Sequence, residues 1–182
     1  MTYDRVTRTD LLLNIKITSL WNPLLSKIMI FVTNIVEPLP LLVLLFSVSS
    51  VLFCQKRYKK LWVLAFSLTS GLFSYLAIKV LIHRIRPANS LLRVSRYSFP
   101  SGHAVISIIF FSFLIYCFKD NIKNSFLKII FVLANIFIFL LIGFSRIYLG
   151  VHWFSDVLAG FSLGLFWLSF FILILGKKGN KK

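Results

Sequence analysis

Five long apolar stretches separated by short basic loops limit what this chain can fold into more than any other feature. They cover residues 38–54, 61–82, 102–118, 129–144 and 153–175. Each is close to the roughly 20 residues that a helix needs to cross the hydrocarbon core of a bilayer. Hydrophobic residues make up 58% of the chain, whereas soluble domains contain about 45–50%. We therefore predict an all-α integral membrane helix bundle.

The segment before these stretches is apolar but interrupted by polar and charged side chains. Lys16, Lys27 and Glu37 are among them, and a lysine in the middle of a span costs about 2.5–3.5 kcal/mol. We therefore interpret residues 1–37 as an interfacial, amphipathic segment in which Trp21 is an anchor. A sixth span within it stays open, so we expect about five to six transmembrane helices.

The chain has the length of one domain, which we take to be residues 1–182. Within it we place a transmembrane core at residues 38–175 and a basic tail at residues 176–182. Gly160 and Gly164 form a pair of small residues on one face of the last stretch, which predicts close packing against a neighbouring helix.

A first cluster of chemically active side chains lies in the sequence "KVLIHRIRP". Lys79, His83 and Arg86 are spaced i, i+4, i+7, so a helix would place all three on one stripe. Pro87 ends that helix or biases Arg86 out of it. The cluster fits an anion site, and it fits equally well a basic helix end whose long side chains reach the head groups.

A second cluster is "PSGH", which directly precedes an apolar run. The N-terminus of a helix exposes unpaired N–H groups and binds anions. Gly102 allows the backbone to come close to a ligand, Ser101 adds a hydroxyl donor, and His103 would face the bound anion. An ordinary helix cap remains the alternative.

A third cluster, "SRIYLGVHWFSD", contains the only acid in any of the five stretches. His152 and Asp156 are four residues apart, so the carboxylate can accept the imidazole N–H from the next helical turn. The other ring nitrogen is then free to attack an electrophile. Because an acid within a span is costly without a partner, Asp156 predicts a functional site.

Taken together, the motifs K-x6-RP at residues 79–87, PSGH at 100–103 and SR-x5-H-x3-D at 145–156 resemble those of the type 2 phosphatidic acid phosphatase (PAP2) superfamily. The resemblance implies that His152 is the nucleophile that forms a phosphohistidine, that Asp156 orients it, and that His103 is the general acid. It further implies a phosphate-binding set made of Lys79, Arg86, Ser101, Gly102 and Arg146.

Four more residues flank this site without belonging to the motifs: Arg84, Arg93, Arg96 and Tyr97. We expect them either to contact a second phosphate or a head group, or to be interfacial anchors. The resemblance implies a metal-independent reaction without a cofactor.

The leading hypothesis is a membrane lipid phosphatase that acts on the phosphate monoester or diphosphate of a lipid head group. Undecaprenyl pyrophosphate, phosphatidylglycerophosphate, phosphatidic acid and lipid A 1-phosphate all remain open as substrates, as does the oligomeric state. The alternatives are a lipid-to-lipid phosphotransferase with the same site, a zinc hydrolase that uses His103, His152 and Asp156 as ligands, and a non-catalytic lipid-binding protein.

Charge distribution bears on partners and orientation. The net charge is +16, but the cations lie in short loops between apolar stretches, which excludes a nucleic-acid-binding domain. Loops 55–60 and 119–128 and the tail fall at one end of the bundle, and positive charge in short loops marks the cytoplasmic face. The motif end is basic too, but we assign its cations to phosphate. We therefore expect a multi-pass protein of the inner (cytoplasmic) membrane whose active site faces the extracytoplasmic side.

Overall fold

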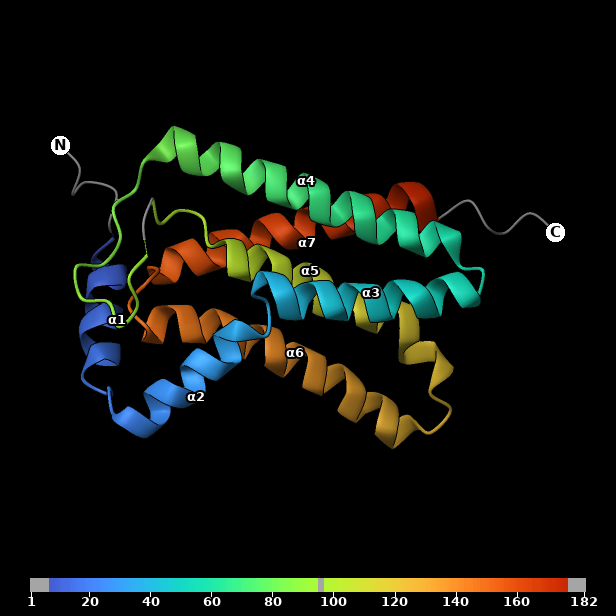
Figure 1. The fold of residues 1–182 in the computed structure, drawn as a ribbon, viewed down its shortest axis with the longest axis horizontal. Helices are drawn as coiled ribbons and strands as arrows, with labels where there is room; N and C mark the ends of the chain where they lie inside the picture. The colour runs from blue at the N-terminus through green and yellow to red at the C-terminus, as the bar shows by residue number, and fades with distance from the viewer. Residues whose placement is uncertain (1–6, 95–96, 177–182) are drawn as a thin grey trace.

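The computed structural model describes residues 7–94 and 97–176, and within these residues the regular structure is helical throughout (Figure 1). Seven α-helices and one short 3-10 helix follow one another along the chain. They are α1 (Arg8–Thr18), α2 (Pro23–Asn34), α3 (Pro38–Cys54), α4 (Tyr58–Ile82), α5 (Gly102–Phe118), η2 (Lys119–Asn121), α6 (Ser125–Tyr148) and α7 (Phe154–Gly176). The predicted all-α membrane bundle is confirmed.

Helix α5 is the centre of the bundle. It packs against α4, α6 and α7, while α3 lies beside α4 and α2 beside α6. Half of the residues in the apolar window of α5 are buried, against 17–28% in the other three long helices. The faces of α4, α6 and α7 that point outward remain apolar and exposed, as expected of surfaces that contact lipid tails.

Among the described residues, four helices are long and apolar enough to cross a membrane, and α2 with α3 makes a fifth span if the pair, bent by 48°, is counted as one broken span. The sequence predicted the bounds of α3 and α5 without error, but placed those of α6 too close together. Helix α6 begins before the predicted stretch because the side chain of Asn124 caps it, accepting a hydrogen bond from the N–H of Leu127 at 3.0 Å. It continues beyond the stretch to Tyr148, where Arg146 is buried inside the protein.

The N-terminal helices cover one end and one side of the bundle. Helix α1 lies across the ends of α6 and α7. The indole N–H of Trp21 donates to the backbone oxygen of Tyr148 at 2.6 Å, and its role as an interfacial anchor stays a prediction. The interfacial location of residues 1–37 stays a prediction, as does the basic tail, most of which lies outside the described residues.

The glycine pair of α7 brings α7 into close contact with α5, as predicted. A Cβ atom at Gly160 would lie 2.6 Å from the carbonyl oxygen of Ser101, and one at Gly164 would lie 2.8 Å from that of Val105. Larger side chains at these two positions would force the helices apart. The pair therefore holds the N-terminus of α5 against the first turns of α7, where the chemically active residues lie.

Candidate active site

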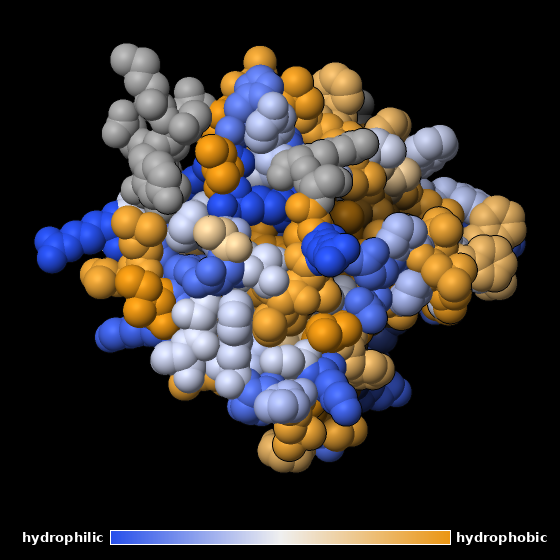
Figure 2. All heavy atoms as spheres, turned by 60° about the vertical axis from the view of Figure 1, so that its left-hand side comes forward, coloured by the Kyte–Doolittle hydropathy of each residue, from blue (hydrophilic) through white to orange (hydrophobic). Residues whose placement is uncertain are grey.

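The three sequence motifs meet at one end of the bundle. Here the C-terminal ends of α4 and α6 lie near the N-terminal ends of α5 and α7, on the left in Figure 1. Figure 2 brings this end forward and shows hydrophilic side chains gathered across it, with hydrophobic side chains around them. The three motifs thus lie in a polar end of a bundle whose long helices are apolar on their outer faces.

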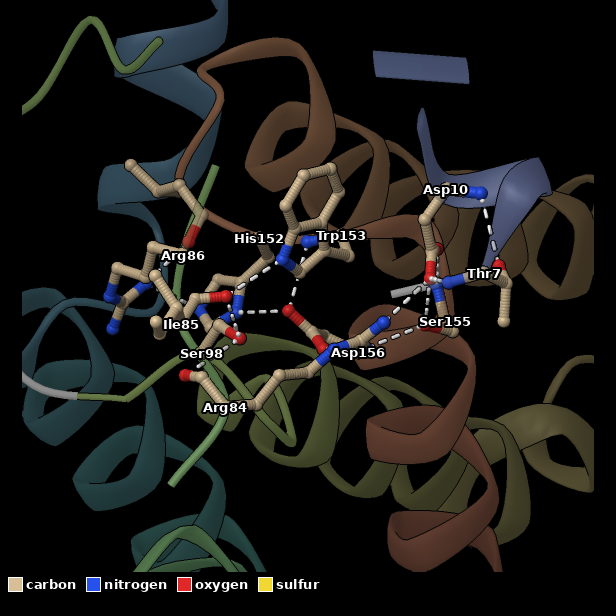
Figure 3. Close-up of polar contacts among 11 residues, drawn as sticks. Thr7, Asp10, Arg84, Ile85, Arg86, Ser98, His152, Trp153, Ser155 and Asp156 are labelled. Atoms are coloured by element: carbon tan, nitrogen blue, oxygen red, sulfur yellow. Dashed lines mark hydrogen bonds and ion pairs between the residues drawn. The ribbon is translucent and has the colours of Figure 1, made fainter. Parts of the chain in front are cut away.

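His152 and Asp156 lie together in the buried part of this end (Figure 3). Nδ1 of His152 is 3.5 Å from Oδ2 of Asp156, and the same oxygen accepts a hydrogen bond from the backbone N–H of Trp153 at 2.9 Å. Our expectation that both residues share a helix was wrong, because α7 begins only at Phe154. The contact forms all the same, since the loop turns the imidazole toward the first turn of α7.

Backbone hydrogen bonds hold the loop that carries His152. Gly150 follows the end of α6 with a φ of +68°, a conformation that glycine adopts without strain. The chain then folds back, so that the N–H groups of Val151 and His152 both donate to the carbonyl oxygen of Arg146 at 3.2 Å. The imidazole is therefore placed by main-chain contacts before any substrate arrives.

The surroundings of His152 favour its neutral form. Its side chain is 3% exposed, and burial lowers the pKa of the imidazole to about 4. The Asp156 carboxylate nearby opposes this shift, while the positive charges of Arg86 and Arg146 add to it. A histidine must be deprotonated to act as a nucleophile. Nε2, which lies 3.4 Å from Nη1 of Arg86, is the ring nitrogen that faces away from Asp156.

Two predicted phosphate ligands carry buried polar atoms without a hydrogen-bond partner in the described structure. These are Oγ of Ser101 and Nε of Arg146. Leaving such a group unpaired costs about 1–3 kcal/mol. Arg146 is held from behind, since its Nη1 donates to Oγ1 of Thr33 in α2 at 2.6 Å. An anion bound between Ser101 and Arg146 would satisfy both free atoms.

Gly102 begins α5, as the sequence predicted, and its missing side chain leaves room for a neighbouring ring. A Cβ atom at Gly102 would lie 3.0 Å from the ring of Tyr75 in α4. Nζ of Lys79 lies 5.3 Å from the centre of that same ring. The glycine thus brings the end of α4, with Lys79, close to the N-terminus of α5.

The predicted stripe of Lys79, His83 and Arg86 on one helix was wrong. Helix α4 ends at Ile82, and His83 adopts a left-handed conformation with a φ of 53° that stops the helix. The ring of His83 then packs against that of Tyr97, with 4.3 Å between the ring centres. Arg86 lies on the following loop, where it donates to the backbone oxygen of Val151 next to His152.

Among the expected head-group contacts, Arg84 requires a correction. Its side chain is 4% exposed and forms ion pairs with Asp10 and Asp156, so it faces the protein interior and is not available to a head group. Tyr97 lines a cleft of about 710 Å³ together with Lys79 and Arg86. Arg93 lines a neighbouring recess that also contains Arg86. Arg96 lies outside the described residues.

Two acids that the sequence interpretation gave no role contact this cluster. Oε1 of Glu37, at the joint between α2 and α3, lies 3.1 Å from Nε2 of His103. Asp10, in α1, pairs with Arg84 at 2.6 Å. The small number of acids could have marked Glu37 and Asp10 as candidates, because a chain of net charge +16 has only five of them.

Comparison with known proteins agrees with this geometry. The sequence profile of the PAP2 superfamily matches residues 60–180, which include all three motifs. The chain belongs to the PAP2 superfamily. It is 33% identical over 157 residues to phosphatidylglycerophosphatase B of Bacillus subtilis (strain 168), a match that covers 83% of this chain and 74% of that protein.

Solved structures of PAP2 proteins share the fold. A transmembrane PAP2-type phosphatidylglycerolphosphate phosphatase from Bacillus subtilis superimposes with a TM-score of 0.82 at 27% identity, over 98% of this chain and 90% of the other. LpxE of Aquifex aeolicus superimposes with a TM-score of 0.75 at 23% identity, over 95% and 99% of the two chains. The protein is therefore a multi-pass membrane lipid phosphatase of the PAP2 superfamily, and a hydrolase.

We predict that His152 stays neutral far below the ordinary histidine pKa of about 6.5, down to about pH 4. NMR titration of histidine-labelled protein in detergent measures this directly, and the signal is assigned by its absence from a His152→Gln variant. The chain has only three histidines, which keeps the spectrum simple. A midpoint at or above that of free histidine would contradict the buried, cation-flanked environment described above.

Proposed function

We propose that this PAP2 protein dephosphorylates phosphatidylglycerophosphate through a phosphohistidine on His152. The observation that carries the mechanism is the arrangement of the His152 ring. Nδ1 faces the Asp156 carboxylate, while Nε2 faces the cationic side of the site beside Arg86. A neutral imidazole held in this way presents a lone pair where a phosphate bound by the cations would lie.

In the proposed reaction, Nε2 of His152 attacks the phosphorus atom as the bond to the lipid oxygen breaks. The lipid oxygen takes a proton from His103, and Asp156 stabilises the positive charge left on the His152 ring. Lys79, Arg86, Arg146, Ser101 and the N–H groups at Gly102 bind the remaining phosphate oxygens. Water then attacks the phosphohistidine, with His103 accepting its proton, and releases inorganic phosphate.

The contact between His103 and Glu37 supports the role of His103 as proton donor. Three cations and a second histidine act on His103: Lys79 from α4, Arg86 from the following loop, Arg146 from α6 and His152. Burial of the ring opposes a protonated imidazole most strongly and these charges add to that effect, whereas a carboxylate at 3.1 Å favours the protonated form. Glu37 is the acid whose oxygen lies within hydrogen-bond distance of the ring, so we assign it the task of keeping His103 able to donate.

The choice of lipid rests on two observations. The relative at 33% identity is a phosphatidylglycerophosphatase. In addition, the cleft that contains Lys79 and Arg86 is otherwise lined mainly by apolar side chains, including Leu76 and Val80 on the outer face of α4. A lipid in this cleft would keep its tails in the bilayer with its phosphate at the cations. The other three lipids, and transfer of the phosphoryl group to a lipid acceptor, are outcomes of the test below.

We further propose that the active site faces the extracytoplasmic side of the inner membrane. The opposite end carries basic residues in its short loops, among them Lys56, Arg57 and Lys123, and the positive-inside rule counts such loops. At the active-site end, Arg84 and Arg146 have partners or tasks inside the protein. When Arg84 and Arg146 are left out of the count of loop charges, the positive-inside rule assigns the opposite end to the cytoplasm.

We predict that purified protein releases phosphate fastest from phosphatidylglycerophosphate in a panel with phosphatidic acid, undecaprenyl pyrophosphate and lipid A 1-phosphate. His152→Ala is expected to lower kcat by about 10⁴-fold or more, as loss of a nucleophile does, while the variant elutes as a folded protein. Turnover retained by this variant would overturn the mechanism, and a faster reaction with another lipid would reassign the substrate. Phosphate recovered on a lipid acceptor would indicate a transferase.

The same assay tests the zinc-hydrolase alternative. Within the described residues, no group of three His, Cys, Asp or Glu side chains is placed to hold a metal ion. Activity that is lost with EDTA and restored by zinc would nevertheless favour that alternative over ours.

We predict that His103→Ala discriminates between leaving groups. A lipid alkoxide needs a proton as it departs, so this variant is expected to lose about 10²–10⁴-fold in kcat with the lipid. A p-nitrophenolate leaving group needs no proton, so the first turnover of p-nitrophenyl phosphate, followed as a burst of p-nitrophenolate, should proceed at a rate close to that of the unmodified protein even though the later attack by water is slowed. His152→Ala is the matched control and should lose both reactions. Equal losses in the first turnover of both substrates in His103→Ala would exclude the general-acid role.

The orientation can be tested with cysteine labelling in intact cells. Cys54, beside the loop at the opposite end, is exposed, whereas Cys117 is buried. We expect a membrane-impermeant maleimide to label Cys54 only after permeabilisation. In a Cys54→Ser background, Ser90→Cys, in the exposed loop at the active-site end, should be labelled in intact cells. The reverse pattern would place the active site in the cytoplasm.

A further inference from the structure

A buried ion-pair network connects the first helix to the catalytic pair. Nη2 of Arg84 lies 2.6 Å from Oδ2 of Asp10, and Nη1 lies 2.5 Å from Oδ1 of Asp156 (Figure 3). The Arg84 side chain is 4% exposed and both carboxylates are fully buried. Arg84 also donates to Oγ of Ser155 at 2.7 Å. One cation is therefore shared by two acids that come from opposite ends of the sequence.

Asp10 is held in this position from several sides. It accepts hydrogen bonds from the backbone N–H and the hydroxyl of Ser155, at 2.9 and 2.7 Å. It also forms a reciprocal capping box with Thr7 at the start of α1. Burial by itself would raise the pKa of Asp10, but the hydrogen bonds from Ser155, Arg84 and Thr7 hold the pKa below its ordinary value. The carboxylate is therefore ionised at neutral pH.

The network does not owe its presence to stability alone. Removing three charged groups from water costs several kcal/mol per ion, and apolar side chains of similar volume often stabilise a protein as well or better. A buried network of this kind therefore calls for another reason. The reason that the geometry offers is the Asp156 carboxylate, whose Oδ1 is bound by Arg84 while its Oδ2 faces His152 and the N–H of Trp153.

The second acid adjusts the charge as well as the geometry. If Arg84 were paired with Asp156 alone, its charge would cancel that of the carboxylate and weaken the attraction for an imidazolium. With Asp10 present, the three groups together keep one negative charge next to His152. We infer that Asp10 of α1 is a positioning residue for the phosphoryl-transfer site, which acts through Arg84 to orient Asp156 and to preserve its negative charge for His152.

This inference rests on the proposal that His152 is the nucleophile. It extends the active site to α1, which lies outside residues 60–180, where the superfamily profile matches. It also assigns a task to Asp10, which the sequence presents merely as an acid within an apolar segment.

The inference makes a prediction in which two substitutions have opposite effects. Besides the network, the charged or titratable groups that face His152 are Arg86 from the loop after α4, His103 from α5 and Arg146 from α6. None of these changes in the two variants. Asp10→Asn leaves the charge of Arg84 uncompensated, so the pKa of His152 should fall. Arg84→Gln removes that charge, so the pKa of His152 should rise.

The experiment combines the histidine NMR titration with steady-state kinetics on the full chain in detergent. For Asp10→Asn we expect kcat to fall by about 10–100-fold, as typically follows when a group that orients an active-site ligand is lost, with KM changed by less than about twofold. Asp10→Glu should restore part of kcat. Thr7→Ala is the matched control, because it removes the helix cap while it leaves the Asp10 carboxylate in place, and it should not move the His152 titration.

The outcomes separate this inference from the mechanism on which it rests. If Asp10→Asn and Arg84→Gln shift the His152 titration in the same direction, or if Thr7→Ala reproduces the effect of Asp10→Asn, then α1 has a structural role only and the inference fails. Should Arg84→Gln not fold, Ser155→Ala, which removes one hydroxyl from the network, is expected to lower kcat without a change in KM, and a wild-type kcat would count against us. Turnover that survives His152→Ala would instead overturn the proposed mechanism.

Discussion

The burial of Asp156 is the constraint on which the rest of this structure depends. Its side chain has no exposure at the end of an apolar bundle, where an unpaired carboxylate would be strongly destabilised. Every polar contact around it satisfies that requirement: Arg84 on one oxygen, the N–H of Trp153 on the other, and the imidazole of His152 beside it. The groups that stabilise the buried Asp156 carboxylate are thus the same groups that form the candidate active site.

The helix packing places this carboxylate accurately because α5 and α7 approach so closely. Gly160 allows the backbone at Ser101 to contact α7, and the N–H of Ser101 then donates to the backbone oxygen of Asp156 at 3.0 Å. The N-terminus of α5 is therefore joined directly to that of α7. Since helix ends carry the unpaired N–H groups that bind anions, this packing also determines where a phosphate can lie.

Local patterns in the sequence predicted the helices and the motif residues well. The apolar stretches at residues 38–54 and 102–118 coincide with α3 and α5. A helix within a membrane is apolar over its whole length, so the run of apolar residues marks where it begins and ends. The contact between His152 and Asp156 was also expected, although the structure makes it from a loop and not within a helix. Contacts of this kind join residues that are close together in the chain, so the local sequence is enough to predict them.

Partners that are far apart in the chain could not be found in the same way. Asp10 with Arg84, Glu37 with His103 and Thr33 with Arg146 are separated by 74, 66 and 113 residues. No local period relates them, so the sequence offers Arg84 only as a head-group contact or an interfacial anchor and does not reveal its buried acidic partners. Only the fold shows that α1 and the joint between α2 and α3 lie over the motif residues.

In the proposed mechanism, one of these distant acids, Glu37, allows two histidines in one small site to take opposite roles. His152 is 3% exposed and has Arg86 and Arg146 near it, which favour the neutral ring of a nucleophile. Burial and the neighbouring cations favour a neutral ring at His103 as well, and the contact that opposes them is the Glu37 carboxylate 3.1 Å from Nε2. Assigning acid and base by environment rather than by residue type is how enzymes divide such tasks. In the proposed mechanism this assignment depends on Glu37 at the joint between α2 and α3, which contacts His103 and not His152, so the N-terminal part of the chain supplies a difference between two identical imidazoles that the motif residues do not.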